Sequence, residues 1–356
     1  MVMVDDGLMA VLICTGMWFS VINGMNDISG LIAPVVATRA TSVVRAHALA
    51  IVGLWLGIFL AHAAVARTVA LGLVHFPKHT LPPSFVLVVW LGGVAGAVIW
   101  GICARRLGVP TSATHAFMGS LCGAALAASG STSSVDWGVA SLFSTVPHIQ
   151  GMMKVVGGLI LSPLAGSLLG YLMFRLLILL GVRASQAAHG VLRRGQCAIL
   201  VLAAFCYGSN DAQNVMGAIV GALMSRAWIA SFHVPWWLGL MNAIALTVGV
   251  LIGSSRIIRT VGSGLIALTV AEATCGQAAE TMSVLTAAHL GAPVSSSQVL
   301  SSALVGAGGA YRPRHVRWAR VRQILFVWII TFPGACAVGG TLATILRLVL
   351  EVTHGP

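Results

Sequence analysis

Charged residues are scarce in this sequence of 356 residues: together Asp, Glu, Lys and Arg make up 8% of it, whereas 58% is hydrophobic. An ordinary soluble domain is about one quarter charged. Stretches such as 46–66 and 236–254 contain none of the four charged residue types, and each has about the length, roughly 20 residues, of a helix that spans a bilayer. This composition excludes a soluble globular domain and predicts an all-α polytopic protein of the cell membrane.

The few charges are also unequal in sign, because eight acidic residues stand against 20 Lys and Arg, a formal net charge of +12. The basic residues lie in short loops between apolar segments, which is a pattern of membrane topology rather than of a nucleic-acid surface. The seven cysteines lie within or beside apolar segments without metal-ligand spacing and are interpreted as packing residues. We therefore expect the lipid bilayer as a partner, no nucleic acid and no resident cofactor.

Two short motifs occur twice in the chain at nearly the same offset. The first is GMND at 24–27 and GSND at 208–211, which places the two aspartates 184 residues apart. The second is VPTSATHAFMGSLCGA, which contains Pro110, and APVSSSQVLSSALVGA, which contains Pro293, 183 residues later. Two ordered matches at a common offset indicate an internal duplication.

The duplication divides the chain into a first transmembrane repeat (1–180), a short cytoplasmic connector (181–195) and a second transmembrane repeat (196–356). Each repeat has five apolar segments, at 8–36, 46–66, 83–103, 110–128 and 152–180, then at 196–222, 236–254, 262–288, 293–310 and 323–349. An odd number of crossings turns the second repeat upside down relative to the first, so the predicted fold is two inverted-topology repeats. The short segments that begin at Pro110 and Pro293 are predicted to be broken or re-entrant helices.

The distribution of basic residues supports this topology. If the loops at 37–45, 104–109, 181–195, 255–261 and 311–322 face the cytoplasm, they hold 14 of the 20 Lys and Arg. This asymmetry is what the positive-inside rule describes. Both termini are then predicted to lie outside.

Four of the eight acidic residues fall at membrane depth: Asp27, Asp211, Glu272 and Glu280. A carboxylate there costs on the order of 2.5–3.5 kcal/mol even by lenient insertion scales, so such residues are usually functional. Asp27 and Asp211 occupy equivalent positions of the two repeats, next to helix-breaking Gly and Ser. Carboxylate and amide oxygens suit a hard monovalent cation or a proton, which predicts a coupling-cation site that comprises Asp27, Asp211, Gln213 and Asn214.

The second motif pair carries hydroxyl groups directly after its prolines: Thr111, Ser112 and Thr114 in the first copy, and Ser295, Ser296 and Ser297 in the second. Proline followed by Ser or Thr marks a helix start, where free backbone N–H groups and the positive end of the helix dipole favour an anion. Two such starts from inverted repeats can meet near the midplane and hold one tetrahedral oxyanion. Such an anion beside carboxylates is repelled unless a cation or proton binds with it, which predicts symport.

The motifs resemble those of a known family. GMNDISG and GSNDAQNVMGAI resemble the duplicated GANDVANA-type signature of the inorganic phosphate transporter (PiT) family, and VPTSATHAFMGS and APVSSSQVLSSALVG are similar to its duplicated P-[ST]-[ST]-[ST]-H segments. SSRIIRTVGSGLIAL, QAAETMSVLTAA and VRWARVRQILFVWIITFP also resemble its second half. The resemblance covers most of the chain, and the short central connector is similar to that of the prokaryotic low-affinity phosphate permeases.

The resemblance implies a symporter that imports inorganic phosphate by alternating access, driven by sodium or protons, with sodium as a co-substrate rather than a cofactor. It implies that Asn26 and Asn210 join the hydroxyl residues at the phosphate site and that Glu280 belongs to the cation sites. Two positions depart from the family pattern. Gly30 stands where the family usually has Asn, and Gln298 replaces the second motif's His, whereas the first motif keeps His115.

Three alternatives remain open from the sequence. The same architecture could carry sulfate or another tetrahedral oxyanion. A passive channel would show flux without a cation gradient. An intramembrane aspartyl protease would resemble a chain with YD and GxGD motifs, and neither occurs here, so we expect no enzyme. The sequence also leaves open the choice between sodium and protons and the oligomeric state, a homo-oligomer included.

Overall fold

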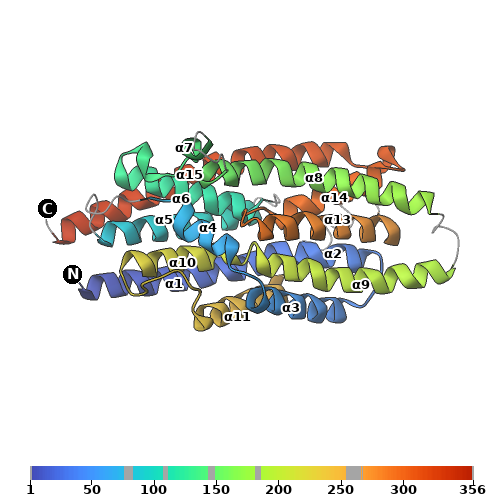
Figure 1. Cartoon of the computed structure of the whole chain (residues 1–356), viewed down its shortest axis with the longest axis horizontal. Helices are drawn as coiled ribbons and strands as arrows, with labels where there is room; N and C mark the ends of the chain where they lie inside the picture. Colours follow the sequence, from blue (N-terminus) through green and yellow to red (C-terminus); the bar gives the residue numbers. More distant parts are fainter. Residues whose placement is uncertain are drawn as a thin grey trace.

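The computed structural model of the chain is a bundle of helices that run roughly parallel to its long axis (Figure 1). It describes residues 2–75, 83–106, 111–142, 149–180, 186–253, 266 and 268–354. Within these ranges there is no β-strand, and a single bridge pairs Val74 with Val135. Pro110, the first residues of the predicted connector (181–185) and the predicted cytoplasmic loop 255–261 lie outside the described residues. The predicted all-α fold is confirmed.

The helices follow the predicted apolar segments. The first half forms α1 (Val2–Asn23), the π-helical turn η1 (Gly24–Ile28), α2 (Ser29–Ala37), α3 (Val43–Leu60), α4 (Ala64–Gly72), α5 (Pro83–Arg106), α6 (Ala113–Ser129), η2 (Thr132–Ser134), α7 (Val139–Leu142) and α8 (Gly151–Leu179). The second half forms α9 (Gln186–Ser209), α10 (Gln213–Ser225), α11 (Trp236–Gly253), α13 (Val270–His289), α14 (Ser296–Gly309), η3 (Pro313–His315) and α15 (Trp318–His354).

Seven stretches of the described residues are long and apolar enough to cross a membrane: α1–α2, α3, α5, α8, α9–α10, α11 and α15. They account for seven of the ten predicted segments. The other three segments correspond to α6, α13 and α14. Helices α6 and α14 have 17 and 14 residues, less than the roughly 20 that a full crossing needs. The chain is therefore a multi-pass membrane protein in which two of the ten segments form only short helices.

Two of the long helices are interrupted at their middle, at the GMND and GSND motifs. The first motif forms the π-helical turn η1, and the second lies at a break of three residues between α9 and α10. A π-helical turn disturbs the regular i to i−4 hydrogen bonding and is often found at functional sites. On α11, the Asn242 amide donates to the carbonyl oxygen of Ala212 within the second break (2.9 Å). The Ala212 carbonyl group, directly after Asp211 in the chain, is thus satisfied by a side chain of another helix.

The two predicted halves are interlocked. Helix α6 packs against α5 and α15, and in the same way α14 packs against α13 and α8. Helix α3 packs against α9 of the other half, and α11 packs against α1 and η1. The last long helix of each half thus covers a helix pair of the other half, so residues 1–180 and 196–356 do not form separate bodies.

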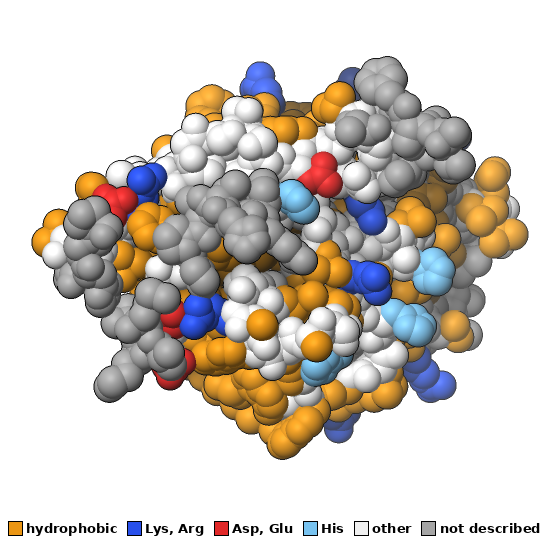
Figure 2. All heavy atoms as spheres, turned by 60° about the vertical axis from the view of Figure 1, so that its left-hand side comes forward, with side chains coloured by type: hydrophobic (Ala, Val, Ile, Leu, Met, Phe, Trp, Pro, Cys, Tyr) orange, Lys and Arg blue, Asp and Glu red, His pale blue; other side chains and the backbone are white. Residues whose placement is uncertain are grey.

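The outer surface is largely apolar, and both chain termini lie at the same end of the bundle (Figure 1). Figure 2 shows broad hydrophobic patches with isolated Lys and Arg side chains between them. Large apolar side chains are exposed along the outer helices, among them Leu60, Leu164, Leu251 and Ile329. This is the surface expected where lipid tails, rather than water, contact the helices.

Helices α6 and α13 begin at side chains that cap them. The Ser112 hydroxyl accepts a hydrogen bond from the His115 backbone N–H (3.1 Å). At the start of α13, Thr269 and Glu272 form a reciprocal capping box, in which the carboxylate accepts from the Thr269 N–H (2.8 Å) and hydroxyl (2.9 Å). Glu272 therefore satisfies a local helix start, unlike the other three acidic residues at membrane depth.

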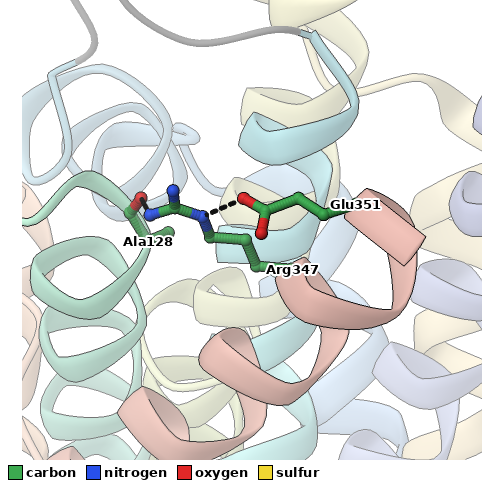
Figure 3. A network of polar contacts seen from close by, with 3 residues as sticks. All are labelled: Ala128, Arg347 and Glu351. Carbon is green, nitrogen blue, oxygen red and sulfur yellow. Dashed lines mark hydrogen bonds and ion pairs between the residues drawn. The ribbon is translucent and has the colours of Figure 1, made fainter. Parts of the chain in front are cut away.

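Arg347 anchors α15 to the α5–α6 pair at the end of the bundle where the termini lie (Figure 3). Its Nη1 donates to the carbonyl oxygen of Ala128 (3.1 Å), which belongs to the last turn of α6. Its Nε donates to Glu351 (2.8 Å), and its guanidinium lies 5.5 Å from the centre of the Phe85 ring. Because the last carbonyl groups of a helix have no partner within it, this arginine completes the end of α6.

Glycines in the two motifs allow the closest helix contacts. A Cβ atom at Gly24 would collide with the backbone carbonyl of Leu246 on α11, and one at Gly208 would collide with the Leu54 carbonyl on α3.

We expect Gly24→Ala to lower the stability of the purified protein by about 1–3 kcal/mol, because the backbone must shift to accept the methyl group. The measurement is thermal unfolding in detergent.

The matched control is Gly30→Ala, since no atom lies within 4 Å of a Cβ built at Gly30. Its unfolding temperature should stay the same or rise slightly, because alanine favours a helix interior over glycine. Equal destabilisation by the two substitutions would contradict the packing argument.

Candidate functional site

The four motif segments meet at the middle of the bundle. Helices α6 and α14 extend from there toward opposite ends (Figure 1). Their starts touch, because the Thr114 hydroxyl in the first turn of α6 donates to the Val294 carbonyl just before α14 (3.1 Å). The two hydroxyl motifs therefore face each other, as the sequence predicted, and each presents a helix N-terminus.

Asp211 lies between these two helix starts and is only 3% exposed. Its carboxylate accepts hydrogen bonds from the Ser296 hydroxyl, the Ser296 backbone N–H (3.4 Å) and the Thr114 hydroxyl (3.2 Å). The donors come from both α6 and α14. A negative charge at a helix N-terminus is stabilised by free N–H groups and the helix dipole, so Asp211 occupies an anion-binding position itself.

Asp27 lies on the π-helical turn, is 5% exposed, and is close enough to Asp211 for the two carboxylates to repel each other. The Ser297 side chain lies within hydrogen-bonding reach of the Asp27 carboxylate, but Oδ2 of Asp27 has no partner. Asp27, Asn26 and Thr111 line a cavity of about 10 Å³. That space is about the size of one water molecule or small ion.

Further oxygen atoms at the centre also lack partners. Glu280 on α13 is fully buried, lies close enough to Asp211 to repel it, and has an unpaired Oε1. The side-chain oxygens of Asn26 and Asn214 are unpaired as well, although the Asn214 amide donates to Thr114 (3.3 Å). Amide and carboxylate oxygens can only accept, so a buried group of them calls for cations or protons.

The remaining predicted site residues have structural partners. Asn210 holds the segment before α14: its oxygen accepts from Val294 N–H (3.0 Å), and its amide donates to the Ala292 carbonyl (2.9 Å). The Gln213 oxygen accepts from the N–H groups of Val65 and Ala66 at the start of α4, both at 3.0 Å. The Gln213 amide donates to the His62 carbonyl (2.9 Å). Both residues position the centre instead of pointing free oxygens into it.

The six predicted hydroxyl residues also fall into two groups: some have structural partners, and others reach the carboxylates. Ser112 caps α6 and also contacts the His115 ring nitrogen Nδ1 (2.9 Å). Thr111 pairs with Thr331 of α15 (2.9 Å) and accepts from the Trp100 ring. Ser295 precedes α14 and contacts the Ser297 hydroxyl (3.2 Å). Of the six predicted hydroxyl residues, Thr114, Ser296 and Ser297 reach the carboxylates.

Two buried hydroxyl residues at the centre were not predicted from the sequence. Tyr207 and Ser29 are fully buried, and neither hydroxyl has a hydrogen-bond partner. A signal for Tyr207 exists in the sequence, because it is one of only three tyrosines and stands four residues before Asp211, in the turn that leads to GSND. Ser29 follows Asp27 by two positions in the equivalent motif.

A large apolar cavity is separate from the carboxylates. It has a volume of about 750 Å³ between α8, α14 and α15, and its walls are mostly aliphatic and aromatic side chains. Polar side chains at its border include His115 and Gln298, and both amide atoms of Gln298 are unpaired. None of Asp27, Asp211 or Glu280 lines this apolar cavity.

A bundle of membrane-length helices with a buried acidic centre between facing helix starts is typical of membrane transport proteins, in which substrate and ion sites lie near the bilayer midplane. The chain belongs to the phosphate transporter family, whose sequence profile matches residues 23–190 and 180–339. The predicted resemblance is thereby confirmed.

Relatives and a solved structure agree with this assignment. The chain is 30% identical over 333 residues to a probable low-affinity inorganic phosphate transporter of Rhizobium meliloti, which covers 93% of this chain and 94% of the relative. It is 29% identical over 333 residues to one of Bacillus subtilis, covering 93% and 95%. A structure named as the sodium-dependent phosphate transporter superposes with a TM-score of 0.84 at 20% identity, covering 97% of this chain and all of the other, which shows the shared fold.

The two signature asparagines should respond differently to substitution. Asn210→Ala removes both hydrogen bonds that hold the segment before α14, so we expect a loss of about 1–3 kcal/mol in stability. Asn26→Ala removes an oxygen that has no partner and should cost clearly less. Thermal unfolding of both purified variants measures the difference. A larger loss for Asn26→Ala would contradict these assignments.

Proposed function

We propose that this protein is a symporter that imports inorganic phosphate through the cell membrane, coupled to sodium ions. The observation that carries the proposal is the pair of buried carboxylates, Asp27 and Asp211, beside the facing N-termini of α6 and α14. Family membership supports phosphate as the substrate, and the shared fold with a sodium-dependent phosphate transporter supports sodium over protons.

Electrostatics explains why the two ions would move together. Asp27 and Glu280 each lie close enough to Asp211 to repel it. No Lys or Arg is found among the described hydrogen-bond partners of these three acids or around the cavity at Asp27. A phosphate anion added to this centre is repelled unless positive charge enters with it. The unpaired oxygens of Asn26, Asp27, Asn214 and Glu280 are suitable ligands for sodium. Binding of each ion therefore favours the other.

The phosphate would lie at the helix starts. Ser296 and Ser297 begin α14, and Thr114 lies in the first turn of α6. The first turn of a helix carries backbone N–H groups that have no partner within the helix and that favour an anion. Asn210 supports this site from behind by holding the segment that leads into α14. Thr111, Ser112 and Ser295, which the sequence also placed at the phosphate site, are proposed to shape the helix starts through their own hydrogen bonds.

Alternating access around this centre completes the proposal. The reciprocal packing of α15 on α5–α6 and of α8 on α13–α14 supports the predicted inverted repeats. Because the halves are interlocked, we propose that each moving group contains helices of both repeats. The positive-inside rule would place the arginine-rich loops in the cytoplasm and both termini outside. Since the relatives are transporters, we expect no enzymatic activity.

The test is uptake of labelled phosphate into proteoliposomes, with sodium and proton gradients imposed separately. We expect uptake with the sodium gradient alone and little inhibition by unlabelled sulfate. Uptake that requires only the proton gradient would show that protons, and not sodium ions, are the coupling ions. Uptake abolished by sulfate would favour the alternative substrate, another tetrahedral oxyanion, and uptake without any gradient would indicate a passive channel.

Replacing either central aspartate should uncouple transport. We expect Asp27→Asn and Asp211→Asn each to reduce sodium-driven uptake about tenfold or more, because each removes a negative charge that holds the cation. Asp6→Asn is the matched control, since Asp6 is exposed near the start of α1. Membrane insertion, followed by fluorescence size-exclusion chromatography, should be unchanged in all three. Normal sodium-driven uptake in both central variants would contradict the cation-site assignment.

A further inference from the structure

Tyr207 is a buried polar side chain whose hydroxyl is not used within the protein. It lies in the last turns of α9, its side chain has no exposed area, and its ring packs in the main hydrophobic core. Its hydroxyl has no hydrogen-bond partner. Buried tyrosine hydroxyls usually find a partner, because an unpaired hydroxyl in an apolar environment destabilises the folded protein.

The surroundings of this hydroxyl are acidic. Tyr207 lies close enough to interact electrostatically with both Asp27 and Asp211, yet it donates to neither. Asp211 already accepts from Thr114 and Ser296, which leaves it well supplied with donors. The phenol thus stands beside the ion site without being part of its existing hydrogen-bond network.

The chemistry of the two transported ions decides which of them suits this hydroxyl. The unpaired carboxylate and amide oxygens of the site, on Asn26, Asp27, Asn214 and Glu280, can only accept, and they suit cations. A phosphate anion presents acceptor oxygens and needs donors. A phenolic hydroxyl is a donor that carries no charge, so it can bind an anion without reducing the need for sodium.

We propose that Tyr207 is a substrate-binding residue, whose hydroxyl donates a hydrogen bond to an oxygen of the bound phosphate between Asp27 and Asp211. This inference rests on the proposed function and adds to it a donor from α9, outside the two helix starts. It also accounts for the unpaired hydroxyl: phosphate is the partner that the protein itself does not supply.

The test is Tyr207→Phe, which removes the hydroxyl and keeps the ring. We expect the phosphate concentration for half-maximal uptake to rise about tenfold or more, as for a lost hydrogen bond to a charged group. The sodium concentration for half-maximal uptake at saturating phosphate should stay unchanged. Without phosphate, the unfolding temperature should stay the same or rise, because an unpaired buried hydroxyl has been removed.

Tyr171→Phe is the matched control, because Tyr171 lies on α8 and is 41% exposed. Its phosphate and sodium dependences should equal those of the wild type. The same uptake and unfolding measurements, the latter with and without inorganic phosphate, apply to all three proteins. Phosphate should raise the unfolding temperature of the wild type and of Tyr171→Phe more than that of Tyr207→Phe.

Each contrary result has a distinct meaning. An unchanged phosphate dependence in Tyr207→Phe would overturn the inference alone. A shift confined to the sodium dependence would make Tyr207 a cation ligand and also overturn it. A lower unfolding temperature with normal kinetics would make the hydroxyl structural. A wild-type protein that neither takes up phosphate nor is stabilised by it would instead overturn the proposed function, and this inference with it.

Discussion

The repulsion between buried carboxylates at the centre of the bundle is the constraint on which the rest of the structure depends. Asp211 is stabilised by donors from two helices, Thr114 of α6 and Ser296 of α14. Asp27 and Glu280 each keep an oxygen without a partner. A folded membrane protein tolerates such groups only where other charges arrive to neutralise them, because unpaired charges in a low-dielectric interior are very unfavourable. Hydrogen-bond donors thus stabilise the negative charge of Asp211, whereas the free oxygens of Asp27 and Glu280 still lack a cation or a proton.

The unusual features of the fold serve to bring donors and acceptors to this point. The π-helical turn and the break between α9 and α10 allow two long helices to change course beside the aspartates. The short helices α6 and α14 begin at the centre and present their N-termini there. Gly24 and Gly208 let α11 and α3 approach the interrupted segments closely. Asn242 donates to the Ala212 carbonyl at the second interruption. Close packing by glycine and uncharged polar residues thus holds the three carboxylates in position.

Sequence patterns were most reliable where an interaction is local or repeated. Low charge and long apolar stretches predict the membrane helices, because each segment must bury its own backbone in lipid. The repeated Asp and hydroxyl motifs predict the centre of the molecule, and α6 and α14 indeed begin there. The functions of individual polar residues were harder to assign. Gln213 and Glu272 both have the residue type of an ion ligand, yet one caps α4 and the other caps α13.

The sequence by itself determined the membrane class, the family and the candidate residues of the proposed ion site, because hydropathy and repeated motifs can be recognised along one chain. Only the tertiary structure decided which of those residues share a site. Whether an oxygen of Asn214 or Glu280 is free, or the hydroxyl of Tyr207 unpaired, depends on neighbours far away in the sequence. Thr114, which accepts from the Asn214 amide, lies 100 residues before it. The interlocking of the two halves is equally a tertiary property: it follows from which apolar faces pack together, and helix α15 meets α5 and α6 only in space.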